Sequence, residues 1–251
     1  MRRELSALLG AAAVLLVPAV AAAQPARGVG PDDLLARPIA LVVALALVAI
    51  LPFAFMTVTA FVKISTVLQI VRGAIGAQSV PSNTVVMALA GALTLLAMAP
   101  VGSRIADRAG PIFEQAAEDT SALVKGAITA TREPLRAFLK ANASERERRR
   151  FHEIAKSARP EAERAAVGAD DLLVLIPAFM TTELVEAFAL GFAIYLPFLI
   201  IDLVVSNVLL ALGMQMMNPT QVSLPFKLLL FVAIDGWGLL AQALVGGYSP
   251  G

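Results

Sequence analysis

Two long apolar runs on either side of a short polar break, 214–223, constrain this chain more than any other feature of its sequence. The first run, 172–212, would be roughly 60 Å long as a single helix, about twice the thickness of a bilayer's hydrocarbon core. We therefore expect either one long bent helix that leaves the membrane or a lead-in helix followed by a span, with Pro177 and Pro197 as the bend points. The second run, 224–245, has the length of one span.

The composition is that of a membrane protein. Apolar residues make up 58% of the chain and charged residues 16%, whereas soluble domains are about 45–50% apolar. The lack of cysteine excludes disulfides, a thiol nucleophile and thiolate metal sites, and one histidine, His152, cannot form a multi-histidine site. The sequence contains no phosphate-binding loop, Ser-His-Asp set or basic-aromatic surface. We predict a protein that is not an enzyme, uses no cofactor or metal and binds no nucleic acid.

Residues 1–23 have the layout of a secretory signal peptide. Two arginines precede an apolar stretch at 7–20, and the alanines at 21–23 resemble a small-residue cleavage site. An uncleaved first transmembrane helix is the alternative. The mature chain would begin with a short polar segment, 24–38.

Residues 39–102 are predicted to form a first hydrophobic helical hairpin. Its two spans are expected at 39–62 and 84–101, with the turn between them at 77–83. Pro52 is a candidate kink in the first span. With the N-terminus outside, Lys63 and Arg72 lie near the cytoplasmic loop, in agreement with the positive-inside rule.

Most of the charge lies in 103–171, which is predicted to be a helical insert. Leu135, Phe138 and Leu139 have the spacing of an apolar helix stripe. The run 145–150 mixes arginine with glutamate, which favours a solvated helix face over a nucleic-acid or lipid patch. Two spans precede the insert, so with the N-terminus outside we expect it on the periplasmic side. Its arginines do not contradict this, because loops longer than about 60 residues do not follow the positive-inside rule.

The fold is therefore predicted to be all-α, with two membrane-type helical hairpins flanking the insert. The second hairpin covers 172–247 and contains the polar break, and a tail follows at 248–251.

Six polar or charged residues lie inside or at the edge of the second hairpin's apolar sequence. They are Glu183, Glu186, Asp202, Asn207, Lys227 and Asp235. A charge in hydrocarbon is unfavourable by a few kcal/mol or more, so such residues usually face a partner or a water-filled cavity. Either they only hold the helices together, or they line a polar passage. Glu183 and Glu186 share a helix face but have no accompanying base or metal ligands, so we interpret them as packing or interface charges.

The polar break carries three methionines in four positions, Met214, Met216 and Met217. Gly213 can end a helix, and the proline that follows Asn218 prevents a direct restart, so the cluster is expected on a turn. Methionine is flexible and fills irregular cores, but a cluster on a turn also suits a deformable constriction.

Three strings of the chain stand out, ALGMQMMNPTQVSLPFKLLLFVAIDGW at 211–237, PAFMTTELVEAFALGFAIYLPFLIIDLVV at 177–205 and FMTVTAFVKISTVLQIVRGAIGAQSVPSNTVVMALAGALTLLAMAP at 55–100. Together they resemble the FliP/SctR family, the core proteins of the export gate in bacterial flagella and type III secretion injectisomes. The strings occur in the family's order, and the sequence at 61–64 is more similar to the injectisome branch than to the flagellar one.

The resemblance implies a homopentamer that associates with FliQ/SctS-like and FliR/SctT-like subunits in a helical, conical assembly. This assembly would conduct unfolded secreted substrates across the bacterial inner membrane. Met214, Met216 and Met217 would line its methionine gasket, although Gln215 stands where many relatives have another methionine.

Two residues match charged family positions associated with subunit contacts, Glu183 and Lys227. We expect Glu183 to pair with Lys227 or Lys63, within or between protomers, and Asp202 is a further candidate partner.

The alternative function is a small-molecule or ion transporter that uses the intramembrane charges as its site. The two hydrophobic hairpins show no inverted repeat, which disfavours it. A passive scaffold for the secretion machine is compatible with the pore.

Overall fold

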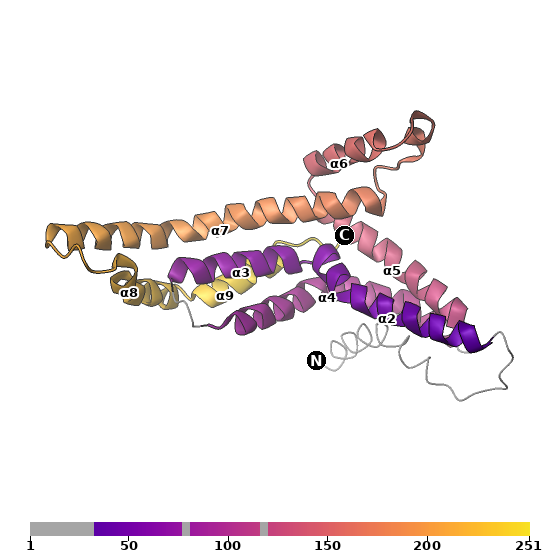
Figure 1. Cartoon of the computed structure of the whole chain (residues 1–251), viewed down its shortest axis with the longest axis horizontal. Helices are drawn as coiled ribbons and strands as arrows, with labels where there is room; N and C mark the ends of the chain where they lie inside the picture. Colours follow the sequence, from indigo (N-terminus) through magenta and orange to yellow (C-terminus); the bar gives the residue numbers. More distant parts are fainter. Residues whose placement is uncertain (1–32, 77–80, 116–119) are drawn as a thin grey trace.

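The computed structural model describes residues 33–76, 81–115 and 120–251 as an elongated, all-helical molecule without strands (Figure 1). Its elements are α2 (Asp33–Val58), α3 (Phe61–Ile75), α4 (Asn83–Gln115), α5 (Thr120–Asn142), α6 (Glu145–Ser157), the 3-10 helix η1 (Glu161–Ala166), α7 (Leu172–Ala211), α8 (Pro219–Ala233) and α9 (Gly236–Gly246). The all-α prediction is confirmed. The expected signal peptide, most of the polar segment 24–38 and part of the turn at 77–83 lie outside the described residues.

Helix α7 runs along the long axis of the molecule (Figure 1). At one end lies the turn between α7 and α8 that carries Met214, Met216 and Met217, called the methionine turn here, and α6 lies at the other end. It is one continuous helix of 40 residues, and Pro177 and Pro197 both lie inside it. Of the two expected forms, the structure therefore has the single long helix. Helix α3 packs along α7, and α4 and α9 lie on the other side of α3 (Figure 1).

Two candidate spans are broken. The first consists of α2 and α3, which meet at a 72° bend at Thr59 and Ala60 rather than at Pro52. This bend lies near the end of the expected span 39–62, and α3 continues beyond it. The Thr59 hydroxyl contributes to this break, since it donates to the Phe55 carbonyl at 2.6 Å and accepts from the Phe61 amide at 3.3 Å. Local hydrogen bonds of this kind compete with the helix ladder.

The second broken span is divided into α8 and α9, which meet at 59°. Asp235 adopts a left-handed conformation there, with φ 50°, which a helix cannot accommodate. Two helical stretches, Asn83–Ile112 and Leu172–Ala211, are long and apolar enough to span a membrane by themselves. If each bent pair counts as one span, there are up to four among the described residues, which fits a membrane protein.

The charged insert is helical and packs on the body at one end of α7. Helix α4 continues through the expected boundary at residue 103, so the change in composition there does not coincide with a helix end. Phe138 and Leu139 of α5 are fully buried against Leu175 and Phe179 of α7. The apolar stripe read from the sequence is thus the face by which α5 joins the body.

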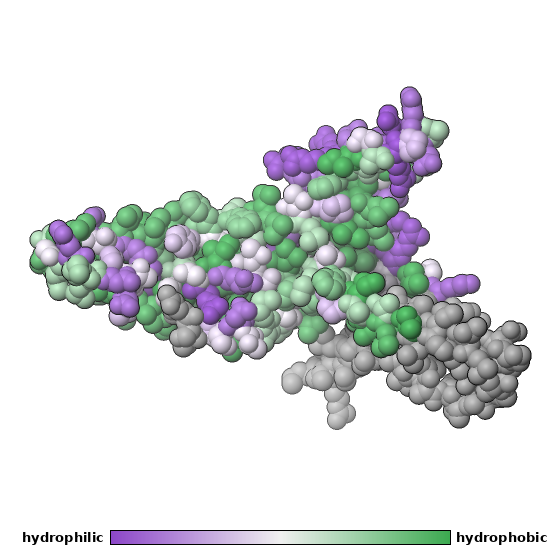
Figure 2. All heavy atoms as spheres, viewed as in Figure 1, coloured by the Kyte–Doolittle hydropathy of each residue, from purple (hydrophilic) through white to green (hydrophobic). Residues whose placement is uncertain are grey.

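Helix α6 is fixed to α7 by a shared cap. The Ser144 hydroxyl accepts from the Glu147 amide at 3.3 Å, and the Ser144 amide donates to the Thr182 hydroxyl of α7 at 3.0 Å. Apolar residues cover much of the α7 body, whereas hydrophilic residues gather on α6 (Figure 2).

The close approach of α3 and α7 depends on Gly191. A Cβ there would lie 2.5 Å from the Ile70 Cδ1 and 3.2 Å from the Ile70 Cβ. We expect Gly191→Val to lower the free energy of unfolding by about 1–3 kcal/mol through overpacking, measured by thermal unfolding in detergent. Gly73→Ala is the matched control, because nothing lies within 4 Å of its Cβ position. Equal stability of the two variants would contradict the close packing.

Candidate functional site

The methionine turn projects freely from the tip of the molecule. Met216 is fully exposed, and Met214 and Met217 are 43% and 44% exposed. Gly213 ends α7 with a φ of 72°, and the Asn218 side chain accepts from the Thr220 amide at 3.0 Å to cap α8. The break therefore presents three flexible apolar side chains on a turn that is capped on both sides.

The helices next to the turn expose a broad apolar surface. Its large residues on α7 and α8 include Phe188, Phe192, Leu196, Ile200, Leu203, Val204, Val208, Leu210, Phe226, Leu229 and Val232. Monomeric soluble proteins rarely expose contiguous apolar patches of more than a few hundred Å². Lipid or other protein subunits must cover this surface.

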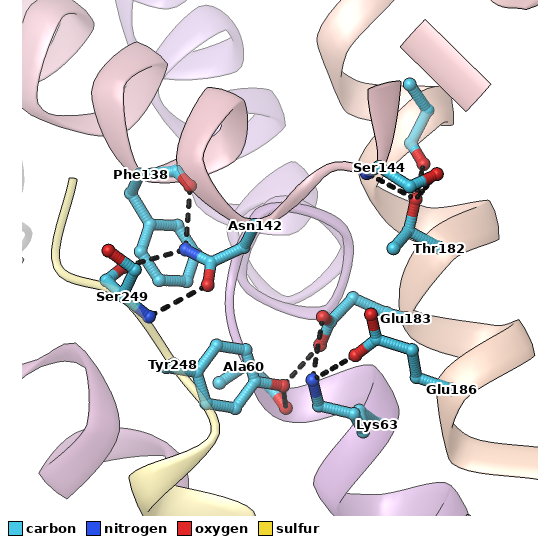
Figure 3. A network of polar contacts seen from close by, with 11 residues as sticks. Ala60, Lys63, Phe138, Asn142, Ser144, Thr182, Glu183, Glu186, Tyr248 and Ser249 are labelled. Atoms are coloured by element: carbon cyan, nitrogen blue, oxygen red, sulfur yellow. Dashed lines mark hydrogen bonds and ion pairs between the residues drawn. The ribbon is translucent and has the colours of Figure 1, made fainter. Parts of the chain in front are cut away.

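A buried charge cluster lies where α3 meets the first part of α7 (Figure 3). The Lys63 ammonium lies 3.1 Å from a Glu183 oxygen and 2.8 Å from a Glu186 oxygen. The Lys63 and Glu183 side chains are 8% and 0% exposed, whereas that of Glu186 is half exposed. Of the two partners expected for Glu183, the structure brings Lys63 to it, within one chain.

Tyr248 completes this cluster, and the sequence reading missed it. The single proton of its hydroxyl is shared between Glu183 and the Ala60 carbonyl, the latter at 3.2 Å. The Lys63 ammonium lies 4.2 Å from the ring centroid (Figure 3). Burial, and then the Glu183 carboxylate, raise the pKa of Tyr248, so the hydroxyl keeps its proton and stays a donor. The only sequence feature at this position is a tyrosine directly after an apolar run. Such a tyrosine does not show which side chain its hydroxyl will bind.

A second buried charge cluster lies nearer the methionine turn. The Lys227 ammonium is 2.6 Å from Asp202 of α7 and donates to the Ala74 carbonyl at 3.1 Å, and Ser223 donates to Asp202 at 2.5 Å. Lys227 thereby places a positive charge on the last turn of α3, where the helix dipole favours one.

Lys227 does not pair with Glu183. It reaches the C-terminal end of α3 at Ala74, whereas Lys63 lies in the first turn of the same helix. Eleven residues of helix separate these points, roughly 16 Å. Glu183 and Glu186 of α7 therefore share Lys63, and Asp202 is the partner of Lys227.

The remaining two polar residues of the hairpin, Asn207 and Asp235, are exposed. Their side chains form no hydrogen bond or ion pair with the residues that the structure describes. Asp235 lies at the bend between α8 and α9.

A polar cavity of about 250 Å³ lies beside the first charge cluster. Its lining includes Lys63, Glu183 and Glu186 of the charge cluster together with Asn142 and Ser249. Within the described ranges, no three histidine or acidic side chains come close enough together to hold a metal ion.

Comparison with known proteins identifies the chain. The FliP family model matches residues 44–244, which include α3, all of α7, the methionine turn and the charged residues of both clusters. The chain belongs to the FliP family. The membership predicted from the three strings is confirmed.

Three known bacterial proteins are similar to the chain along most of their own length. The chain is 44% identical over 208 residues to "Pathogenicity-related ORF2" of Xanthomonas campestris pv. glycines, covering 83% of this chain and 95% of the relative. It is 42% identical over 208 residues to "Hypersensitivity response secretion protein HrcR" of Ralstonia nicotianae, covering 83% and 96%. It is 41% identical over 221 residues to "Yop proteins translocation protein R" of Yersinia pestis, covering 87% and 98%.

Proposed function

We propose that this FliP-family chain is a pore-forming subunit of a type III secretion export gate. It would conduct unfolded protein substrates across the bacterial inner membrane. The observation that carries the proposal is the methionine turn, which projects three exposed methionines from the tip of a long apolar body. The secretion and translocation proteins to which the chain is similar support the same role.

Assembly with other subunits is part of the proposal. The exposed apolar surface of α7 and α8 needs covering, and copies of this chain together with FliQ/SctS-like and FliR/SctT-like subunits would cover it. Family resemblance suggests a homopentamer in a conical assembly, with the charged insert on the periplasmic side. The names of the relatives favour an injectisome over a flagellum.

The methionine turns of neighbouring copies would form the gasket. Apolar constrictions block ions by dewetting, and flexible methionine side chains can part around different residues and close again. The two charge clusters are paired within the chain, so they serve helix packing better than they serve a transporter's substrate site.

Removing the methionine side chains is expected to open the resting pore. We expect Met216→Ala combined with Met217→Ala to raise the ion conductance of assembled complexes in planar bilayers, because a shorter apolar lining dewets less readily. Met56→Ala is the matched control, since this exposed methionine lies on α2 and away from the turn. Unchanged conductance in the double variant would count against the gasket.

A further inference from the structure

Residues 248–251, called the strap here, cross from the end of α9 to the charged insert. Tyr248 packs against both hydrophobic clusters of the molecule, the one around α3 and the one formed by α5 with α7. Among the described residues, Met98 is the other side chain shared in this way. Tyr248 therefore lies at the boundary between the body and the insert.

The insert side of the strap is held by paired hydrogen bonds. The Asn142 amide donates to the Ser249 carbonyl at 2.8 Å and accepts from the Ser249 amide at 3.0 Å (Figure 3). The Tyr248 ring stacks on Phe138 of α5, with centroids 6.0 Å apart. Arg104 donates to the Pro250 carbonyl at 2.7 Å. These contacts attach the strap to α4 and α5.

The body side of the strap is held by the Tyr248 hydroxyl. It bonds to the carbonyl of Ala60, at the bend between α2 and α3, and to the buried carboxylate of Glu183 on α7. Glu183 is paired with Lys63, so its hydrogen bond with Tyr248 is charge-assisted, and its full burial shields that bond from water. The Tyr248 side chain thus joins three parts of the molecule. Its hydroxyl binds the α2–α3 bend and α7, and its ring packs on α5.

We propose that the strap fixes the orientation of the charged insert relative to α3 and α7, and that the Tyr248 hydroxyl is the group on which this orientation depends. The insert also meets the body through the unbroken helix α4, the apolar cluster of α5 with α7, and the packing of α6 along α7, which includes the cap on Thr182. A force on the insert would then reach Lys63 and Glu183 through Tyr248. The strap makes Tyr248 a positioning residue for the first charge cluster.

A cysteine introduced at a buried position tests whether the strap holds this orientation. The chain has no cysteine, so Val101→Cys introduces a single thiol into the cluster between the body and the insert, where Val101 is 1% exposed. Maleimide labelling of the full chain in native membranes then measures how often the cluster opens. Loss of a hydrogen bond to a charged group corresponds to about a 10- to 100-fold change in such an equilibrium, and we expect Tyr248→Phe to speed labelling by that factor.

The matched control is Tyr195→Phe, which removes the other tyrosine hydroxyl of the chain. Tyr195 makes no hydrogen bond with the described residues, so labelling should stay at the parent rate. Equal rates in both variants, whether slow or fast, would overturn the proposal.

A second variant covers the case in which Tyr248→Phe does not accumulate. Ser249→Pro removes the amide that donates to Asn142 but leaves the tyrosine in place. It is expected to speed labelling about 2- to 10-fold, as for a neutral hydrogen bond. Labelling at the parent rate would show that the strap does not hold the insert.

Discussion

Replacing Lys63 with methionine is expected to destabilise the chain strongly. The substitution keeps most of the side-chain volume but leaves the fully buried Glu183 without its cation and beside Glu186. Breaking a buried ion pair from one side lowers the free energy of unfolding by about 3–5 kcal/mol. Thermal unfolding of the purified chain in detergent and the level of assembled complexes in membranes both measure the loss.

Lys140→Met is the matched control for this prediction. Lys140 and Asp170 are only 2.6 Å apart, but both side chains are nearly half exposed. Exposed pairs contribute about 0–1 kcal/mol, so the control should unfold close to the parent. The importance of the buried cluster would be refuted by equal stability of Lys63→Met and Lys140→Met.

A double variant separates loss of the pair from loss of the lysine alone. Combining Lys63→Met with Glu183→Gln removes the uncompensated buried charge that the single variant leaves behind. We expect the double variant to be more stable than Lys63→Met, with a coupling of about 0.5–3 kcal/mol in the double-mutant cycle. Strictly additive losses would mean that the two side chains do not act as a pair.

Replacing Lys227 with methionine is expected to have the second large effect. Lys227 is 2% exposed, and its removal leaves Asp202 with only the Ser223 hydroxyl and leaves the Ala74 carbonyl without its donor. Because Asp202 is about a quarter exposed, we expect the loss near the lower end for a buried pair, about 3 kcal/mol. Helix α8 follows the methionine turn directly, so secretion should fall together with stability.

Charge exchanges test which residues form the pairs. Exchanging Asp202 and Lys227 is expected to restore part of the stability that Lys227→Asp alone loses. Exchanging Glu183 and Lys227 should restore nothing, because the two residues belong to separate clusters along α7. Recovery in the second exchange, measured by secretion and by thermal unfolding, would favour a pairing between subunits instead.

The long helices and the methionine turn could be predicted because hydropathy, glycine and proline report on them directly. Gly213 and the Asn218-Pro219 pair marked the turn, and the stripe of Phe138 and Leu139 marked the buried face of α5. In contrast, the bend at Ala60 interrupts a run that hydropathy reads as continuous. The Asp235-Gly236 pair is a turn signal at the second bend, but hydropathy alone predicts one span over 224–245.

The partners within the site could be narrowed but not chosen from the sequence. Glu183 had two candidate lysines, and the choice depends on which end of α3 lies beside it, a long-range packing property. Tyr248 lies 65 positions from Glu183 in the chain, and no local pattern links them. Helix α4 likewise continues past residue 103, since a helix can change from apolar to polar without ending.

The most direct test of the export-gate proposal is photo-cross-linking of a substrate arrested in transit. A photo-reactive amino acid at Met216 is compared with one at Leu173, which is also exposed but lies at the opposite end of α7. The proposal predicts an adduct between position 216 and the arrested substrate, and little or none at 173. An adduct at 173 without one at 216 would contradict the assignment of the methionine turn to the export passage.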